Sequence, residues 1–229
     1  MSLERHFPFL YDLQSDNLFF ELYDDAQFVG GVAVVFDTCH ISNVRFAKIG
    51  LVCISPFFQG RGYFKKLFHQ CIIEIESQGV DSIVLWTGQH ELYSQFGFQL
   101  SDPYLFGEIN SPAGSDSFNI ITKYGESHLP VPTFSTSCCS YIYRESIVYA
   151  SDFSKGITIL DWKGNDLEIE MIFRSLAKHG CNLNIFRNDS LVTLLEEKGY
   201  QMNLKSSRLQ MQLNTKLLPT LEIKVLDRI

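Results

Sequence analysis

Hydrophobic and polar residues divide the first hundred residues into a hairpin, a further strand, a helix and a fourth strand. Residues 17–36 form two β-branched and aromatic runs around the polar tip Asp24-Asp25-Ala26-Gln27, which predicts a β-hairpin. Residues 46–54 form another apolar run that ends at Ser55-Pro56, because proline cannot continue a central ladder.

A helix is predicted to follow this strand. Its apolar positions recur every three or four residues, at Phe64, Leu67, Phe68, Cys71, Ile72 and Ile75. Gly79 is the expected stop. The short apolar run Asp81–Trp86 then reads as a strand, so the order strand, glycine turn, helix, strand predicts a βαβ unit.

The second half of the chain resembles a fainter copy of the first. Strand-like runs at 141–150 and 156–162 precede a helix that begins near Asn165, with Glu168 placed as in a capping box. Residues 181–186 then read as a strand, followed by a helix ending at Gly199 and one or two further strands. The order of glycine, strand, short helix and Gly-aromatic recurs, which we interpret as a degenerate internal repeat.

These elements predict an α/β fold with a mixed, mostly antiparallel sheet flanked by helices. The C-terminal half is interpreted as a degenerate repeat of the same fold. We expect one domain at 1–124, a linker at 125–140, where proline and serine gather, and a smaller α/β half at 141–229.

Composition narrows the class of protein. Of the 229 residues 45% are hydrophobic and 20% charged, and no apolar stretch is long enough for a membrane helix. The start MSLERHFPFLYDLQSDN lacks the features of a secretory signal, so we expect a cytoplasmic protein with no membrane partner. A formal charge of -7 without a basic cluster argues against nucleic acid and mildly favours cationic substrates.

Six cysteines show no C-x-x-C spacing, and four of them lie in apolar or periodic segments, as reduced buried thiols do. We therefore expect neither a disulfide framework nor a metal site.

The segment that carries candidate chemistry runs from Ile54 to Phe64, ISPFFQGRGYF, between a strand and an amphipathic helix. Such a turn exposes backbone N–H groups that have no partner within the helix, and the helix dipole adds to their attraction for an anion such as pyrophosphate. A Gly-x-Gly turn alone also fits an ordinary βα loop. It does not match a dinucleotide-binding fingerprint or a P-loop.

The neighbouring residues make this turn more specific. The register Ile54-Ser55-Pro56-Phe57-Phe58-Gln59-Gly60-Arg61-Gly62-Tyr63 resembles the signature of the GNAT family of acyl-CoA N-acyltransferases, Val-x-Pro-x-Tyr followed by Arg/Gln-x-x-Gly-x-Gly/Ala. The later segment LWTGQHELYSQFGF is similar to the strand, tyrosine and closing Gly-Phe of that family. The resemblance covers residues 17–100.

The resemblance implies roles for particular residues. The end of the first long strand, at Val52, Cys53 and Ile54, would offer backbone groups to the pantetheine arm of acetyl-CoA. The pyrophosphate would lie on the turn formed by Gln59, Gly60, Arg61, Gly62, Tyr63 and Phe64. Tyr93 would protonate the departing thiolate as the general acid, with no metal required.

Two departures from the family pattern bear on these roles. Phe64 stands where the family has a small residue, and its ring either blocks the pyrophosphate or points into the core; its phase with Leu67 and Phe68 favours the core. The strand before Pro56 lacks the acidic residue that many relatives carry, so no general base is implied. Candidates by position are Glu21, His40, His90, Glu91 and Glu108, each of which also reads as a solvated surface residue.

The sequence therefore predicts an N-acetyltransferase that moves an acetyl group from acetyl-CoA to a primary amine by direct attack, the amine belonging to a small molecule or a protein. The alternative is a catalytically degenerate module that binds acyl-CoA without transferring the acyl group, or that has a regulatory role.

Overall fold

The computed structural model describes residues 7, 16–39, 43–112, 120–124, 137–153, 156–214, 218, 220–224 and 228. Contacts between Cα atoms divide the chain into two compact units. The N-terminal unit is built mainly from Phe9–Asp102 and Arg208–Leu221, and the C-terminal unit from Pro103–Ser207 and Glu222–Asp227.

The N-terminal unit holds a six-stranded sheet in the order β1-β2-β3-β4-β13-β5. Its strands are β1 (Leu18–Asp24), β2 (Gln27–Cys39), β3 (Val44–Ile54), β4 (Ser82–Trp86), β13 (Gln210–Asn214) and β5 (Gln99–Leu100). The predicted hairpin is confirmed as β1–β2, and its tip residues Asp25 and Ala26 both have positive φ. Tight hairpin turns need this conformation to match the twist of the strands.

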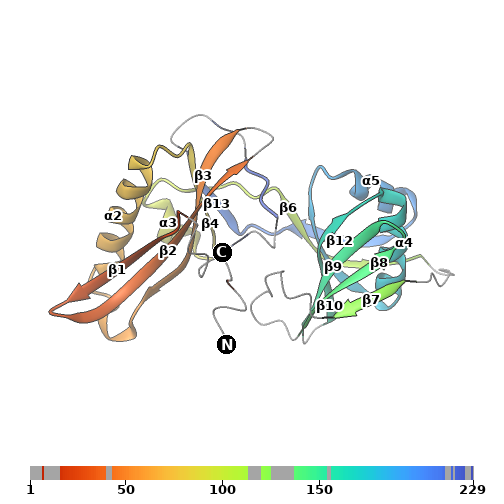
Figure 1. Cartoon of the computed structure of the whole chain (residues 1–229), viewed down its shortest axis with the longest axis horizontal. Helices are drawn as coiled ribbons and strands as arrows, with labels where there is room; N and C mark the ends of the chain where they lie inside the picture. Colours follow the sequence, from red (N-terminus) through yellow and green to blue (C-terminus); the bar gives the residue numbers. More distant parts are fainter. Residues whose placement is uncertain are drawn as a thin grey trace. The chain divides into compact units, whose positions relative to one another are not determined.

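Helix α2 (Tyr63–Ser77) connects the parallel strands β3 and β4, which confirms the predicted βαβ unit. Figure 1 shows α2 lying along one face of this sheet. The helix buries the face that the sequence predicts, Leu67, Phe68, Cys71, Ile72 and Ile75. Gly79 lies just past its end with a φ of 71°. The short helix α3 (His90–Ser94) follows β4.

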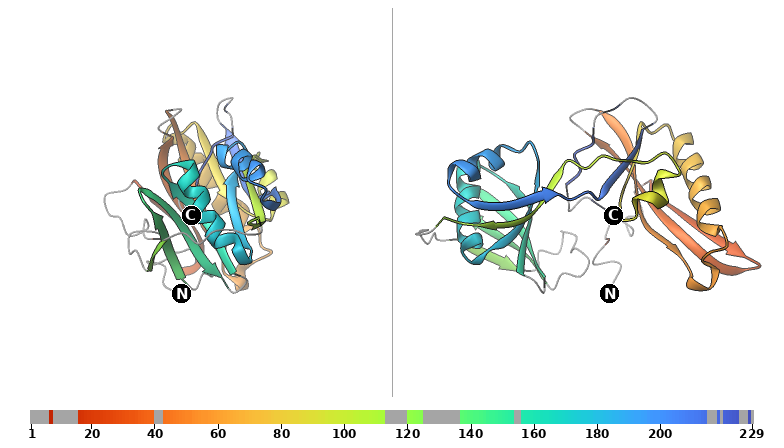
Figure 2. Two further views of the ribbon diagram at one scale, coloured as in Figure 1. Left: turned by 90° about the vertical axis from the view of Figure 1, so that its right-hand side faces the viewer. Right: turned by 180° about the vertical axis from the view of Figure 1, so that it is seen from behind.

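The C-terminal unit holds a seven-stranded sheet in the order β12-β6-β11-β10-β9-β8-β7, with helices α4 and α5 beside it (Figure 2). Its elements are β6 (Tyr104–Asn110), β7 (Ile121–Tyr124), β8 (Ser137–Tyr143), β9 (Ser146–Phe153), β10 (Gly156–Lys163), α4 (Asp166–Leu176), the 3-10 turn η3 (Ala177–His179), β11 (Cys181–Phe186), α5 (Ser190–Glu197) and β12 (Gln201–Ser206). Strands β10 and β11 are parallel and the other pairs antiparallel. Two mixed sheets flanked by helices confirm the predicted fold class.

One predicted strand is divided in two. The run 141–150 forms the end of β8 and the start of β9, joined by a turn at Arg144 and Glu145. Arg144 has a φ of 52°, and Tyr143 pairs with Ser146 across the turn. A polar pair between two apolar runs is therefore a hairpin tip here.

Each sheet contains a strand from a distant part of the sequence. Strand β6 follows β5 in the chain, yet it pairs with β11 and β12 of the C-terminal unit. Strand β13 follows β12, yet it pairs with β4 and β5 of the N-terminal unit. In each sheet, a strand from another part of the chain thus lies between two strands that are consecutive in sequence. Strand β13 lies between β4 and β5, and strand β6 lies between β11 and β12.

This exchange determines where the compact units divide. The change from one unit to the other lies between Asp102 and Pro103, whereas the sequence predicts a linker at 125–140. Residues 125–136 of that linker lie outside the described residues, and residues 137–140 begin β8. The difference arises because the pairing partners of β6 and β7 lie later in the chain.

None of the helices within the described residues has the length and hydrophobicity of a membrane-spanning helix.

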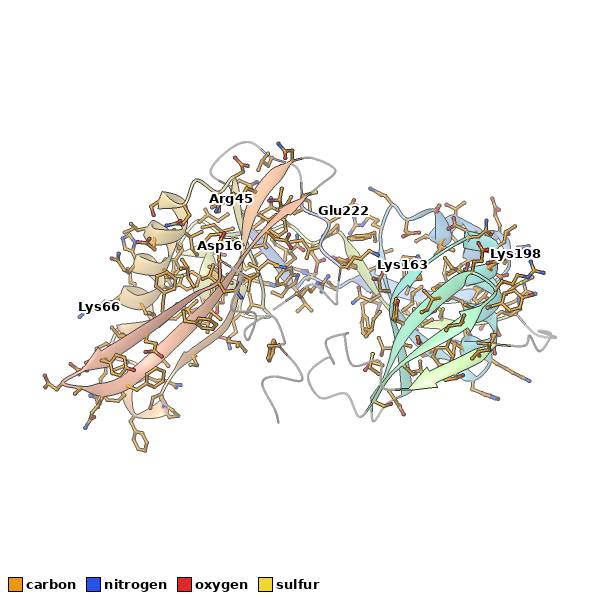
Figure 3. The ribbon with its side chains drawn as sticks, in the orientation of Figure 1. Asp16, Arg45, Lys66, Lys163, Lys198 and Glu222 are labelled. Carbon is orange, nitrogen blue, oxygen red and sulfur yellow. The ribbon has the colours of Figure 1, made fainter. Side chains whose placement is uncertain are left out.

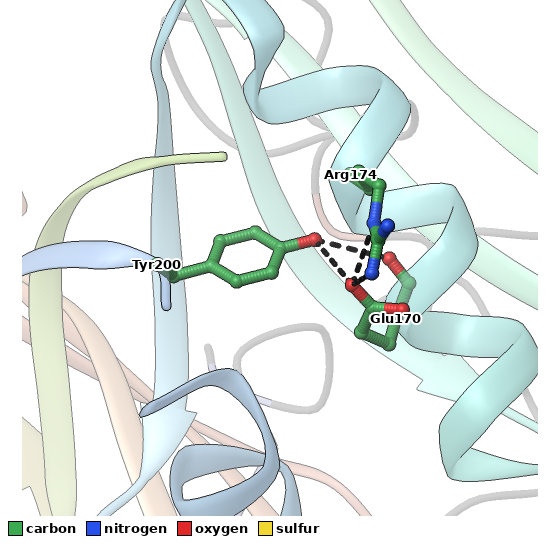
Figure 4. Close-up of polar contacts among 3 residues, drawn as sticks. All are labelled: Glu170, Arg174 and Tyr200. Carbon is green, nitrogen blue, oxygen red and sulfur yellow. Dashed lines mark hydrogen bonds and ion pairs between the residues drawn. The ribbon is translucent and has the colours of Figure 1, made fainter. Parts of the chain in front are cut away.

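A buried ionic network links helix α4 to Tyr200, the residue that precedes β12 (Figure 4). The Glu170 side chain is 4% exposed and accepts two hydrogen bonds from Arg174, at 3.0 and 2.8 Å. The hydroxyl of Tyr200 donates to Glu170 Oε1 at 3.0 Å. Burial and the nearby Glu170 carboxylate raise the pKa of Tyr200, so its hydroxyl remains a donor.

We predict that Arg174→Met lowers the free energy of unfolding by about 3 kcal/mol, because it leaves a buried carboxylate without its cation. Tyr200→Phe removes only one donor and is expected to cost about 1 kcal/mol. The double variant Glu170→Gln, Arg174→Met should recover part of the loss, since the unpaired charge is absent. Urea unfolding measures all three. A single Arg174→Met variant as stable as the wild type would contradict this account.

Candidate functional site

The site begins where two parallel strands separate. Strands β3 and β4 pair from Phe46↔Ser82 to Ile49↔Leu85, and no further pair joins them although β3 continues to Ile54. Beyond Ile49, β3 is paired only with β2 on its other side. The last residues of β3 thus present one edge that β4 does not cover, which is where an extended ligand can add as a strand.

A bulge in β3 accompanies this separation. Gly31 pairs with Cys53 and Ala33 with Gly50, so β3 has one extra residue there. Leu51, within the bulge, has a φ of 50°, which is uncommon for a residue with a side chain. A Cβ at Gly30 would lie 2.3 Å from the carbonyl oxygen of Cys53, so glycine is required for the strands to approach here.

The three residues that the resemblance assigns to pantetheine lie on this edge. Val52 and Ile54 are half-buried against the core, and Cys53 is exposed. Leu51 and Gly30, which shape this edge, were not among the residues predicted from the sequence. The Gly30-Gly31 pair within a strand pattern was the available signal, since glycine in a strand marks a bulge or a close backbone approach.

The glycine turn follows directly. Gly60 and Gly62 have φ of 75° and 80°, and a Cβ at either would meet no atom within 4 Å. The side chain of Gln59 holds the turn by donating to the carbonyl of Ile54 at 3.0 Å. Gly62 is the N-cap of α2, with no side-chain cap and no acidic residue in the first turn.

Backbone donors at this helix start are directed outward. The first hydrogen bond of the helix runs from the Lys66 N–H to the Gly62 carbonyl at 3.3 Å. The preceding N–H groups of the first turn therefore have no partner within the helix. Three cationic side chains lie in the same short segment: Arg61, Lys65 and Lys66, all exposed. Figure 3 shows the side chain of Lys66 extending away from the sheet. This arrangement attracts an anion.

Aromatic contacts position the cationic and polar side chains of the turn. The Arg61 guanidinium lies 5.5 Å from the ring centroid of Phe58, and the Lys66 ammonium 5.8 Å from that of Tyr63. The Tyr63 hydroxyl donates to Asp24 at the hairpin tip, and this hydrogen bond raises the pKa of Tyr63. The tip of β1–β2 is thereby tied to the start of α2.

Tyr93 lies in α3, which starts after the carboxyl end of β4. Because β3 and β4 are parallel, α3 and the glycine turn both lie at the carboxyl ends of their strands. Tyr93 is 8% exposed. Burial raises the pKa of its phenol, so the hydroxyl stays protonated near neutral pH.

An aromatic cluster joins α2 to α3. We use this name for Phe64, Phe68, Tyr93, Phe96 and Phe98. Phe64 stacks on Phe68 at 5.3 Å between centroids and meets Tyr93 edge to face at 5.8 Å. Phe68 meets Tyr93 at 5.2 Å. The ring of Phe64 therefore packs into the core, which is the orientation that its helical phase favours.

The candidate bases do not all lie together. His90 and Glu91 line an open hollow of about 620 Å³ formed by residues 88–92, on the same short helix as Tyr93. The His90 Nε2–H donates to the carbonyl of Arg208 at 2.7 Å, since a carbonyl can only accept, and in the neutral ring Nδ1 is then the acceptor. Glu21 is exposed on β1 and accepts from Tyr23. Glu108 belongs to the C-terminal unit, and His40 lies outside the described residues.

In the C-terminal unit, the start of helix α4 corresponds to this site, and its backbone N–H groups are bonded to side chains of the same unit. Asn165 caps α4 by accepting from the Leu167 N–H at 3.0 Å. Ser146 accepts from the Asn165 N–H at 3.0 Å and donates to Glu168 at 2.8 Å. Ser146 thus stands between the two residues of the predicted capping box. Acidic residues in the first turn and the absence of a Gly-x-Gly turn make this helix start unsuited to a phosphate.

Among the described residues, no three His, Cys, Asp or Glu side chains are grouped so that they could hold a metal ion.

Comparisons with known proteins agree with this fold. Residues 2–98 match the model of the Acetyltransferase (GNAT) family. A probable N-acyltransferase of unknown function from Enterococcus faecalis has a similar structure, with a TM-score of 0.66 and 13% identity over 88% of this chain and 63% of that one. A GCN5-related N-acetyltransferase from Anabaena variabilis gives a TM-score of 0.60 and 16% identity over 85% of this chain and 62% of that one.

A third structure, a GCN5-related N-acetyltransferase from Kribbella flavida, gives a TM-score of 0.61 and 12% identity over 86% of this chain and 60% of that one. At these identities the likeness shows the fold, and the chain spans about three fifths of the length of the three structures. The search of curated proteins found no match.

The position of Phe64 gives a prediction. Phe64→Ala should lower the free energy of unfolding by about 2 kcal/mol, because it removes a ring packed against Phe68 and Tyr93. Phe57→Ala is the matched control: this side chain is 85% exposed on the preceding turn and should cost less than about 0.5 kcal/mol. Denaturant unfolding distinguishes the two. Equal stability of both variants would place the Phe64 ring outside the core.

Proposed function

Because residues 2–98 match the model of the GNAT acetyltransferase family, we propose that this protein transfers an acetyl group from acetyl-CoA to a primary amine. The observation that carries the proposal is the combination of an uncapped helix start on a glycine turn with the uncovered edge of β3 beside it. A pyrophosphate fits the first and a pantetheine arm fits the second. We place the reaction in the cytoplasm, where buried reduced thiols such as Cys71 persist.

The residues suit the binding of acetyl-CoA at this place. The open space at Gly60 and Gly62 lets the backbone approach phosphate oxygens closely. Arg61 adds positive charge on the same turn. The backbone of Val52 to Ile54 would bond the amides of the arm, which places the thioester near the bulge at Leu51.

The reaction we propose is a direct attack. The amine nitrogen bonds to the thioester carbonyl carbon, and the carbon–sulfur bond breaks. A backbone N–H at the β3 bulge would hold the carbonyl oxygen as it becomes negative. Tyr93 donates its phenolic proton to the departing sulfur, and the proton lost by the amine replaces it through water or a base.

His90 is the base that the geometry favours. It lies one helical turn before Tyr93 and lines the open hollow of residues 88–92. The carbonyl of Arg208 orients its ring and leaves Nδ1 as the proton acceptor in the neutral form. An amine in the hollow would give up its proton to Nδ1 directly or through one water molecule.

The cofactor site gives a binding prediction. Gly62→Glu should weaken acetyl-CoA binding at least tenfold in calorimetry, because a carboxylate would meet the phosphates. Gly79→Glu is the control, since Gly79 also has a positive φ of 71° and an open Cβ position, at the other end of α2. The wild-type protein should bind one acetyl-CoA per chain, because the start of α4 in the C-terminal unit is capped by Asn165 and offers no second phosphate site. Similar affinities of the two variants, or two sites per chain, would contradict the proposed site.

Tyr93→Phe tests the enzyme itself. The variant keeps the aromatic packing and removes the proton, so acetyl-CoA should still bind while turnover at saturating acetyl-CoA falls about a hundredfold. Tyr23→Phe, an exposed tyrosine of the same unit, should leave turnover unchanged. A fall of less than about threefold would assign protonation of the thiolate to water. Binding without CoA release across a panel of amines would favour the acyl-CoA-binding module.

A further inference from the structure

The C-terminal unit contains a second place where parallel strands separate. Strands β10 and β11 pair only at Thr158↔Asn182 and Ile159↔Leu183, and the register of β10 against β9 shifts just after Ile159. Beyond these pairs, the two strands line a cavity of about 60 Å³. This space is enough for several water molecules or for a small polar group with its first carbons.

The cavity is rich in hydrogen-bond acceptors. Asp161, Asn184 and Asp189 all line it. Asp161 accepts from the Lys224 ammonium at 2.7 Å, and its side chain is 16% exposed. Lys224 is the single cation among the described residues of the lining. An ammonium group from a separate segment of the chain thus already lies at the wall of this cavity, on a side chain that is 44% exposed.

One acceptor of the cavity has its bonding capacity unused. The Oδ1 atom of Asn184 is buried and has no hydrogen-bond partner among the described residues. A buried acceptor without a donor is costly, by about 1–3 kcal/mol. An ammonium carries three donors, of which Lys224 gives one to Asp161. An ammonium that is not tied to the chain could reach both oxygens.

The walls of the cavity suit the carbon chain of an amine. Trp162, Phe186 and Tyr104 contribute apolar surface, and the rings of Tyr104 and Phe186 lie 4.2 Å apart. Aromatic faces also attract cations. Two carboxylates and one amide fall short of the six or more oxygen ligands that a hard divalent cation requires.

We propose that this cavity is a binding site for a primary alkylammonium group, and that Lys224 is its tethered occupant. The neighbouring Ile223 is 5% exposed, so the segment is held next to the site and the Lys224 ammonium has a high effective concentration there. A free amine competes poorly in the wild-type chain and binds when Lys224 is shortened. The site is independent of the acetyl-CoA site and of the proposed reaction.

Chemical complementation tests the proposal on the full chain. Lys224→Ala keeps Cβ and removes three carbons and the ammonium, which is the composition of n-propylammonium. Adding n-propylammonium chloride should raise the Tm of this variant in a saturable manner, as binding to the folded state requires. Sodium chloride at equal ionic strength and 1-propanol should not do so. Lys163→Ala, which shortens an exposed lysine of the same unit (Figure 3), should respond no more than the wild type.

The acceptor is tested by a second substitution. Adding Asp161→Asn to Lys224→Ala should abolish the response, because the carboxylate partner is lost. The proposal is overturned if n-propylammonium shifts the Tm of the wild type and of Lys224→Ala equally, or if the response survives Asp161→Asn. If Lys224→Ala folds poorly, Lys224→Ser removes the same carbons and ammonium, and its Tm is measured with and without n-propylammonium chloride. None of these outcomes depends on acetyl-CoA turnover.

Discussion

The separation of β3 from β4 is the constraint on which the proposed chemistry of the N-terminal unit depends. Parallel pairing ends at Ile49↔Leu85, and the extra residue at the bulge carries a positive φ at Leu51. Positive φ costs a residue with a side chain about 1 kcal/mol or more, which the pairing with β2 must offset. In return one edge of β3 stays uncovered, and the turn and α3 both lie at this end of the sheet.

The C-terminal unit repeats this architecture but its corresponding openings are filled. Its parallel pair also separates, yet Lys224 lines the cavity beside β10 and β11 and its ammonium is bonded to Asp161. At the start of α4, a Cβ at Gly164 would lie 2.6 Å from Cβ of Ser146, so the turn is packed, whereas Gly62 borders open space. Similar topology therefore gives an open helix start in one unit and a closed helix start in the other.

Sequence patterns predicted the local elements well. The hairpin, the βαβ unit and the caps at Asn165 and Gly79 follow from residues close together in the chain. The exchange of β6 and β13 could not be predicted in this way, because alternating strands such as Tyr104–Asn110 fit either sheet and their partners are distant in sequence. In the candidate site, the glycine turn and Tyr93 could be identified from sequence motifs. The bulge in β3 could not, because it depends on the register between β2 and β3, which local sequence does not determine.

The burial of Tyr93 sets a condition on its proposed role as an acid. A phenol has an ordinary pKa of about 10 and an alkyl thiol about 8.5, so proton transfer to a thiolate is uphill by about 2 kcal/mol in water. Burial raises the pKa of Tyr93 and by itself makes the transfer harder. A thiolate leaving in the same desolvated region is destabilised in the same way, which raises the pKa of its thiol as well. Transfer of the phenolic proton to sulfur leaves Tyr93 as a phenolate, which burial also disfavours. Both charges are avoided only if the proton lost by the amine reaches Tyr93 as the carbon–sulfur bond breaks, so the proposed role requires a proton path from the amine to the phenol.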